Sequence, residues 1–450
     1  MDSNDERVVA ACGSVDVDRW WRQIQDLWLD WFAVCFGRVE VRRAAWSYVE
    51  GLMSLVGRKN CWWLAQQAGH NDPARLQRLL GGARWEADVL RDALLRLVAK
   101  VLAVPDGVLV VDETGFAKKG TGTVATARQY SGTLGRVDNC QLAVFLGYAT
   151  SRVRLLVDRA LYLPKVWAED SARRAKAGVP ETVTFATKPQ LALGMIRRAV
   201  AAGVAAAWVT ADEAYGRAGY FRAGLRLLKL GYVVAVARDQ HVQIARQRHR
   251  VDVLAAKIAP SAWQRYSCGF GSKGPREYRW AWLTIEAGDG HHSLLIRRGA
   301  DGKLAYYLAW STRPVAFTEL VAVAGRRWVI EEMFQITKDQ FGLDHTQVRS
   351  WHGWHRHTTL TMISFALTVL AIRDEQPETD IASDNPIHHS GLTAVTVNEA
   401  RYLIAAIILA TKATGRHLLN HLRRWSTWRR VHQNHARAAH YRRRLATAPC

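Results

Sequence analysis

Apolar residues in the first hundred positions recur with the period of an α-helix. Trp20, Trp21, Ile24 and Trp28 fall on one helical face. This spacing predicts an all-helical N-terminal domain over residues 1–104. Within it, residues 58–80 have the helix, turn, helix rhythm of a DNA-reading unit. Most such pairs are plain helical hairpins, so DNA contact and simple packing both stay open on this pattern alone.

From residue 105 the pattern changes to strands separated by helices. The strand-like runs are Val108–Val111, Gln141–Ala149, Arg152–Leu163, Ala206–Thr210 and Gly231–Ala237. The first three are close enough in sequence to pair antiparallel, and apolar helices precede the last two. This order predicts a mixed five-strand sheet with flanking helices, whose first part covers residues 105–238.

The remaining chain divides into three further segments. Short strand-like runs broken by glycines predict a β-rich insertion over residues 239–312. A helix that begins near Phe317 and continues past Lys338, followed by an apolar helix from His357 to Ile372, predicts the last part of the core, residues 313–373. Residues 374–450 are predicted to form a linker and a basic helical tail.

Composition narrows the class of protein. The 62 Lys and Arg residues outnumber the 40 Asp and Glu residues, and 49% of the chain is apolar, which excludes wholesale disorder and disfavours a neutral metabolic enzyme. The longest apolar stretch, Leu360 to Ile372, is too short to cross a bilayer. The acidic start of the chain does not resemble a secretory leader. We therefore expect a cytoplasmic, nucleoid-associated protein with no membrane partner.

The C-terminal tail points to a polyanion as partner. No Asp or Glu occurs after Glu399, and arginines alternate there with aromatic residues. The candidate DNA-binding arginines of the tail are Arg423, Arg424, Arg429 and Arg430. A solvated basic surface is the alternative, but phosphate neutralisation accounts better for a tail without acids.

Three carboxylates are candidates for a shared site. Asp112 and Asp212 each follow an apolar strand, although a lone Asp at a strand end is as often a turn former or helix cap. Glu331 shares a helical face with Arg327 and Lys338, whereas Glu332 diverges from Glu331 by about 100°. A surface ladder of ion pairs is the alternative explanation for that helix.

The chemistry that needs such a set is metal-dependent cleavage of a phosphodiester. Two Mg²⁺ ions, for which Mn²⁺ can substitute, stabilise the attacking and the leaving oxygen, and three carboxylates suffice to hold them. Arg327 and Lys338 would then bind DNA phosphates beside the ions. The glycines near Lys118 lack the spacing of a nucleotide-binding loop, so no nucleotide cofactor is expected.

Several strings of residues together resemble DDE transposases of bacterial insertion sequences. They are Val111–Phe116, Gln129–Gly132, Thr210–Gly216, Arg327–Glu332, Gly342–Asp344 and Trp351–His357. The chain most resembles the insertion sequence 701 family, in the group with a Tyr, Arg, Glu, Lys signature. Ala324 stands where that signature has its Tyr.

The resemblance implies an RNase H-like core interrupted by a β-rich insertion before the last catalytic residue. It implies that Asp112, Asp212 and Glu331 are the catalytic, metal-binding triad and that Arg327 and Lys338 assist at the DNA. Trp328 stands where some relatives have a tryptophan near a displaced base; a core role is the alternative for it.

The implied activity is cleavage at the terminal inverted repeats of an insertion sequence and strand transfer into target DNA. Double-stranded DNA is the expected partner, and a homodimer on DNA is the expected active form, because two element ends must meet. Arg356, in the last of the strings, is a candidate phosphate contact, with packing as the alternative. The competing functions are an inactive, transposase-derived DNA-binding protein and a nuclease that cuts without joining.

Overall fold

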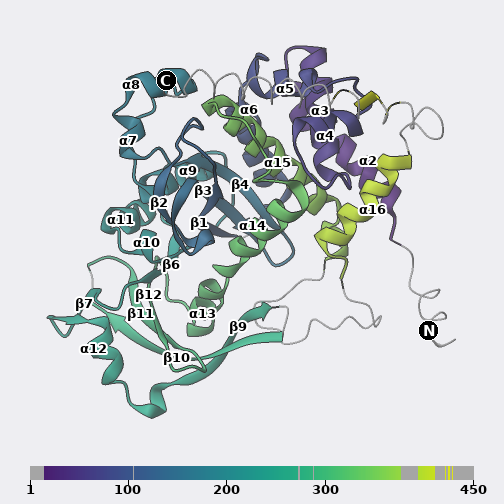
Figure 1. The fold of residues 1–450 in the computed structure, drawn as a ribbon. Helices are drawn as coiled ribbons and strands as arrows, with labels where there is room; N and C mark the ends of the chain where they lie inside the picture. Colours follow the sequence, from purple (N-terminus) through teal and green to yellow (C-terminus); the bar gives the residue numbers. More distant parts are fainter. Residues whose placement is uncertain are drawn as a thin grey trace.

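Helices in the first part of the chain pack beside a large mixed sheet in the second part (Figure 1). The structure is a computed structural model. It describes residues 15–104, 106–271, 274–286, 288–376 and 394–410, together with residues 421, 424, 425 and 428. None of the helices in these stretches is long and apolar enough to span a membrane.

The N-terminal part is helical throughout its described residues. Its elements are α2 (Val17–Leu27), a π turn (Trp28–Phe32), a 3₁₀ turn (Ala33–Cys35), α3 (Val39–Met53), α4 (Cys61–Gln67), α5 (Ala74–Gly81) and α6 (Ala87–Val101). Polar side chains set where two of these helices begin. Asp16 accepts a hydrogen bond from the backbone N–H of Arg19, and Asn60 accepts from those of Trp62 and Trp63.

The centre of the molecule is a mixed sheet with the strand order β4-β3-β1-β5-β6. These strands are β1 (Val108–Ala117), β3 (Arg136–Ala149), β4 (Arg154–Leu161), β5 (Trp208–Ala211) and β6 (Gly231–Val236), with the short β2 (Ala127–Ser131) also paired to β3. β1 is antiparallel to β3 and parallel to β5. Every residue of β3 from Cys140 onward is buried, so helices must cover both faces of this strand.

The sheet is larger than the predicted five strands. β12 (Leu304–Ser311) pairs antiparallel with β6, and β11 (His291–Arg298), β10 (Gly274–Ile285) and β9 (Gln264–Gly271) follow outward, which makes ten strands. Without β12, β6 would expose a row of unpaired backbone groups at the edge. The β-rich stretch therefore extends the core sheet. Only the hairpin of β7 (His241–Ile244) and β8 (Gln247–Arg250) lies outside that sheet among the described strands.

Helices connect and cover the strands. α9 (Lys188–Ala201) precedes β5, and α10 (Glu213–Gly216) and α11 (Gly219–Leu227) lie between β5 and β6. α7 (Lys165–Ala168) and α8 (Ser171–Ala177) follow β4, α12 (Val251–Ala256) follows β8, and α16 (Val397–Ala410) lies beyond α15, described below. Of these helices, α9 packs on β3 and β4, and α10 and α11 pack on β6.

The helix predicted to run from Phe317 past Lys338 is in fact two helices, α13 (Phe317–Gly325) and α14 (Trp328–Phe341). At the junction the backbone N–H of Arg327 bonds to the carbonyl of Ala324, three residues back, so the α-helical ladder is interrupted. Gly325 marks the break. A Cβ atom there would lie 1.7 Å from the carbonyl oxygen of Cys268, so only glycine lets β9 approach the end of α13.

α15 (Trp351–Ala371) joins the helical part to the sheet. It begins six residues earlier than predicted because the Ser350 hydroxyl accepts a hydrogen bond from the backbone N–H of Gly353. It is buried on all sides from Gly353 onward, apart from His355, and it contacts α2, α3, α5 and α6 as well as β4 and α14. In Figure 1 it runs between the N-terminal helices and the sheet.

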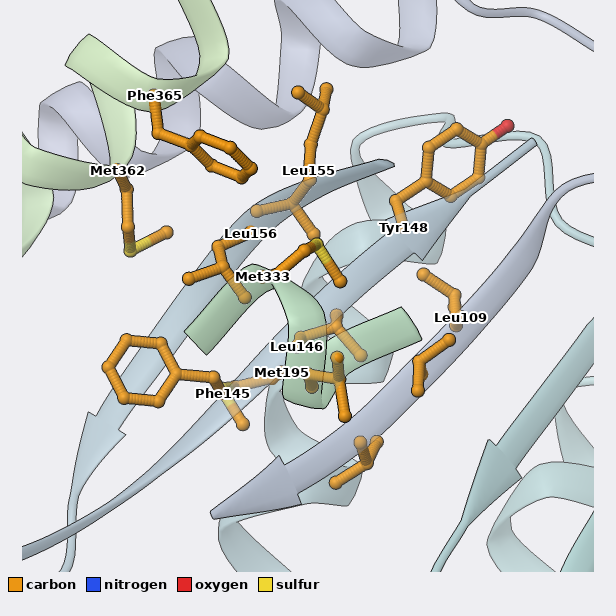
Figure 2. Close-up of a cluster of buried hydrophobic side chains, with 14 of the residues drawn as sticks. Leu109, Phe145, Leu146, Tyr148, Leu155, Leu156, Met195, Met333, Met362 and Phe365 are labelled. Atoms are coloured by element: carbon orange, nitrogen blue, oxygen red, sulfur yellow. The ribbon is translucent and has the colours of Figure 1, made fainter. Parts of the chain in front are cut away.

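One apolar core therefore runs through both parts of the molecule. Figure 2 shows side chains of α15 meeting those of α14 and of the central strands; the labelled residues are Leu109, Phe145, Leu146, Tyr148, Leu155, Leu156, Met195, Met333, Met362 and Phe365. Helices that share a core of this kind cannot move apart without exposing it to water.

Arg356 on α15 is a structural side chain in this conformation. It is 6% exposed, and its two terminal nitrogens donate hydrogen bonds to the backbone carbonyls of Leu80, Gly81, Ala83 and Trp85. Its guanidinium also lies over the Trp85 ring. This group faces the loop after α5 and not solvent, which is the packing that was the alternative for Arg356, and its DNA contact stays a prediction.

We expect Arg356→Ala to lower the free energy of unfolding by about 3 kcal/mol, since it leaves several buried carbonyls without a donor. Urea unfolding followed by tryptophan fluorescence measures the change. Arg349→Ala, at an exposed arginine near the start of the same helix, is the matched control and should change stability by less than about 0.5 kcal/mol. Equal effects of the two substitutions would contradict the structural role.

Candidate active site

Asp112 and Asp212 lie side by side at the carboxyl ends of two parallel strands. The last residue pair of β1 and β5 is Val111 with Ala211, and each of these residues is followed directly by an aspartate. Neighbouring strands are about 4.8 Å apart, so the register alone brings the two carboxylates together. β1 itself continues to Ala117, paired there with β3; what ends at Asp112 is its pairing with β5.

The electrostatics of the two aspartates show how close they are. Burial, then the charges of Asp212 and Glu113, raise the pKa of Asp112 to about 8, although Arg327 acts in the opposite direction. Burial and the charge of Glu113 also raise the pKa of Asp212, whose carboxylate caps α10 by accepting from the backbone N–H groups of Ala214 and Tyr215. A charged pair at this place is therefore unfavourable without a cation.

Arg327 connects this pair to the third candidate carboxylate. Its Nη1 atom lies 3.8 Å from Asp112 Oδ2 and 3.0 Å from Glu331 Oε1. Glu331 lies one helical turn after Arg327, and its side chain is 51% exposed. The predicted shared face of Arg327 and Glu331 thus turns toward the two aspartates.

Glu332 is directed elsewhere. Its carboxylate accepts hydrogen bonds from Arg154 at 2.7 Å and from Arg276 at 3.0 Å, so it links the start of β4 to β10. The divergence of about 100° between consecutive helical residues separates the surroundings of the two glutamates. Of the two, only Glu331 shares a partner with Asp112.

The residues fit a divalent cation, provided that Glu331 exchanges its partner. Oxygen donors from two carboxylates that repel each other are the ligands that Mg²⁺ or Mn²⁺ prefers, and a cation would relieve the repulsion. Within the described residues, no three acidic, histidine or cysteine side chains are already grouped to hold a metal. Glu331, the third candidate carboxylate, is instead paired with Arg327.

Lys338 packs against β1 beyond Asp112. Its ammonium donates to the Thr114 hydroxyl at 2.7 Å and to the Gly115 carbonyl at 3.2 Å, and it lies over the Phe116 ring. Burial lowers the pKa of Lys338. In this conformation the lysine fastens α14 to the strand that carries Asp112, and the predicted phosphate contact stays a prediction.

Trp328 lies between α14 and the outer strands of the sheet. Its ring stacks on Tyr278 of β10 with 6.2 Å between centroids and an angle of 8° between planes. The guanidinium groups of Arg276 and Arg297 lie over the same ring. These contacts show Trp328 packed, as in the alternative interpretation, and its role near a displaced base stays a prediction.

A connection that sequence reasoning missed joins the two aspartate segments. Glu113 accepts hydrogen bonds from Tyr215 Oη at 2.6 Å and from Lys188 Nζ at 2.5 Å. Tyr215 is fully buried and lies three residues after Asp212. Glu113 and Tyr215 both stand in the motif strings, but nothing in those strings shows that they touch.

The tail arginines fall mostly outside the described residues. Arg423, Arg429 and Arg430 lie there, whereas Arg424 is described and exposed. Its neighbour Trp425 is buried and donates its indole N–H to the carbonyl of His70, and the Trp428 ring meets that of Trp62 edge to face. These tail residues therefore lie against α4 and the turn before α5.

A large mixed sheet with two acids at adjacent strand ends and a third on a following helix defines the class of DDE nucleases. Residues 32–257, half of the chain, match the family model described as DDE superfamily endonuclease, and residues 184–367 match the one described as Transposase DDE domain. The chain belongs to the DDE superfamily endonucleases.

The chain is also similar to a curated transposase. The "Probable transposase for insertion sequence element IS701" of Microchaete diplosiphon is 29% identical over 225 residues, which cover 50% of this chain and 56% of the relative. The chain thus spans just over half the length of that curated relative. The resemblance expected from the motif strings is confirmed.

The raised pKa of Asp112 predicts a pH-dependent stability in metal-free protein. Its pKa is about 8 in the fold and ordinarily near 4, so between these values the folded chain binds a proton that the unfolded chain does not. Its contribution to stability should therefore fall as the pH rises from about 4 to about 8. Asp112→Asn removes the charge, so we expect this variant to unfold at a higher temperature than the parent chain at pH 8.

Thermal unfolding in EDTA at pH 6 and pH 8 measures the effect. The control is Asp26→Asn, at an exposed position of α2, which should follow the parent chain at both pH values. A parent chain as stable as the Asp112→Asn variant at pH 8 would show that the carboxylate is not strained.

Proposed function

We propose that this chain is a transposase that cleaves DNA at the terminal inverted repeats of an insertion sequence and joins the freed 3′ end to target DNA. The observation that carries the proposal is the placement of Asp112 and Asp212 at register-adjacent strand ends, with Arg327 between them and Glu331. Membership of the DDE superfamily endonucleases and the match to a probable transposase support it.

The strand order supports an RNase H-like core. β4, β3 and β1 are antiparallel, β5 and β6 follow in parallel, and the β-rich stretch comes between β6 and α14 in the chain. In this order the first two candidate acids follow the ends of two neighbouring central strands. The third candidate acid lies on α14, a helix that packs on β1.

Asp112, Asp212 and Glu331 would hold the metal ions. When bound, two Mg²⁺ ions, or Mn²⁺ in their place, stabilise the attacking and leaving oxygens of the phosphodiester. Asp112 and Asp212 are fixed by the sheet, whereas Glu331 has the exposure and the side-chain length to turn from Arg327. The guanidinium released in that way would be free to bind a DNA phosphate beside the carboxylates.

The expected partners follow from this chemistry. The chain carries a formal charge of +22, which suits duplex DNA, and two element ends must be held together, which favours a homodimer on DNA. The helical N-terminal part and the basic tail are the proposed contacts to the repeats. No nucleotide cofactor takes part in the proposed reaction, which would occur in the cytoplasm at the nucleoid.

Two adjacent glutamates offer a sharp test of the site. The substrate is a duplex that carries the terminal repeat found in the DNA flanking the gene, incubated with the full chain, Mg²⁺ and a supercoiled target. Glu331→Gln should lower the rate of end cleavage at least about 1000-fold, since the amide cannot replace a carboxylate at the metal. Glu332→Gln, one residue away, should stay within about tenfold of the parent chain because its carboxylate faces Arg154 and Arg276.

Asp112→Asn and Asp212→Asn should also abolish cleavage while all variants still bind the end duplex in a gel-shift assay. Full activity of any of these variants would remove that residue from the proposal. If Glu332→Gln lost activity and Glu331→Gln kept it, Glu332 would take the place of Glu331 in the proposed site. Cleavage without joined products would favour the nuclease that cuts without joining. DNA binding without cleavage by the parent chain would favour the inactive DNA-binding protein.

A further inference from the structure

The hairpin of β7 and β8 presents one entirely polar face. In its register His241 lies opposite Arg250, and Gln243 lies opposite Arg248, so these four side chains share a face of the ribbon. All four are exposed, whereas Val242 on the other face is 7% exposed and faces the body of the protein. In Figure 1 the hairpin stands out at the lower left, beside β10 and α12.

The turn of this hairpin is held in a conformation that its residues do not favour. Ala245 and Arg246 have φ angles of 51° and 60°, a left-handed pair that favours glycine or asparagine. Such residues cost roughly 1 kcal/mol or more each and persist only where the surroundings fix them. Here the Glu286 carboxylate accepts hydrogen bonds from both backbone N–H groups, at 2.7 and 2.8 Å. The turn fixes the exposed Arg246 at the tip.

The polar face borders a hollow whose lining includes Arg217, five residues after Asp212 in the sequence. The hollow has a volume of about 460 Å³, and its lining includes Arg217, Asp239, Gln243 and Arg248. Arg217 directly follows α10, the short helix that Asp212 caps. Its guanidinium lies between Glu213 and Asp239, 3.6 and 3.5 Å away, so its charge is partly balanced. Arg248 adds positive charge to the lining, and Arg246 lies outside it at the turn of the hairpin.

The sequence of the ribbon has the composition of a DNA-binding element. No acidic residue occurs from Gln240 to Val251, whereas arginine, glutamine and histidine recur. Arg250 is paired with Asp252, whereas within the described residues no ion pair of the Arg246 or Arg248 side chain is found, and Glu286 binds only the backbone N–H of Arg246. A solvated surface hairpin would need neither the strained turn nor the carboxylate that fixes it. A two-stranded ribbon of this kind fits the major groove of duplex DNA, where arginine and glutamine contact base edges.

We propose that the β7–β8 hairpin is a DNA-binding ribbon that holds the element-end duplex as it leaves the active site. Arg248 and Arg246 contact its backbone, and the polar face lies along its major groove. Arg217 and Arg248 line the same hollow, and Arg217 follows the helix that Asp212 caps, so we assign this surface to the DNA end that is cut at that site. This inference rests on the proposed function and adds a contact surface to it.

The test is the affinity of the full chain for a fluorescent duplex of about 30 base pairs that carries one element end, measured by anisotropy in EDTA over a range of salt concentrations. A random duplex of equal length is the second probe. For the end duplex we expect Arg248→Ala and Arg246→Ala each to weaken binding about 5- to 10-fold. Each should lower the slope of log K against log salt by about 1, as loss of one phosphate contact requires.

Two further variants keep the result interpretable. Arg248→Lys retains the charge and should restore most of the salt slope. Lys303→Ala removes one charge from an 87% exposed residue between β11 and β12 that does not line the hollow, and it should bind within twofold of the parent chain. Unchanged thermal unfolding of these surface variants would show that folding is not the cause.

The outcomes separate this inference from the proposed function. Weaker binding of the end duplex by the Arg246 and Arg248 variants, but not by Lys303→Ala, supports the DNA-binding role of the hairpin. Weaker binding of the random duplex alone, unchanged binding of both duplexes, or an equal decrease in affinity in Lys303→Ala overturns it. If the parent chain cuts the end duplex in Mg²⁺ while the ribbon variants bind it normally, only the ribbon is wrong. If the parent chain binds neither duplex, both proposals are wrong.

Discussion

The pairing of Val111 with Ala211 at the end of the parallel β1–β5 ladder is the constraint on which the candidate site depends. It forces two partly buried carboxylates together, although their charges repel, and the cost appears in the raised pKa values of Asp112 and Asp212. The backbone ladder and the packed strands on either side supply the free energy that holds this arrangement. The large packed core is stable enough to hold this local electrostatic repulsion.

Hydrogen bonds and ion pairs around the two aspartates add further links between the segments that carry the candidate acids. The hydrogen bond from Tyr215 to Glu113 joins the segment after β5 to the strand that carries Asp112, so the two acids cannot drift apart independently. Arg327 holds the third carboxylate one side-chain movement away from the pair. The site therefore has a rigid half on the sheet and an adjustable half on α14, as expected where bound metal and DNA must complete the arrangement.

Local patterns in the sequence predicted the elements well, and long-range packing accounts for what they missed. The succession of strands along the chain, the antiparallel pairing of the first three and the shared face of Arg327 and Glu331 follow from periodicity and chain order. The break before α14 does not, because it depends on the approach of Cys268 to Gly325 across the sheet. The ten-strand sheet and the burial of Arg356 also depend on partners far along the chain. The different directions of Glu331 and Glu332 follow from helix geometry, but their partners do not.

The continuous core also determines how the helical part relates to the candidate site. His357 on α15 accepts a hydrogen bond from Tyr48 of α3, and its other nitrogen donates to the carbonyls of Gly342 and Leu343 at the end of α14. Burial lowers the pKa of His357 to about 4, so it is neutral and can both accept and donate at neutral pH. The N-terminal helices are thus tied through α15 to the helix that carries Glu331. DNA bound by those helices would meet the carboxylates at a distance that this core packing sets.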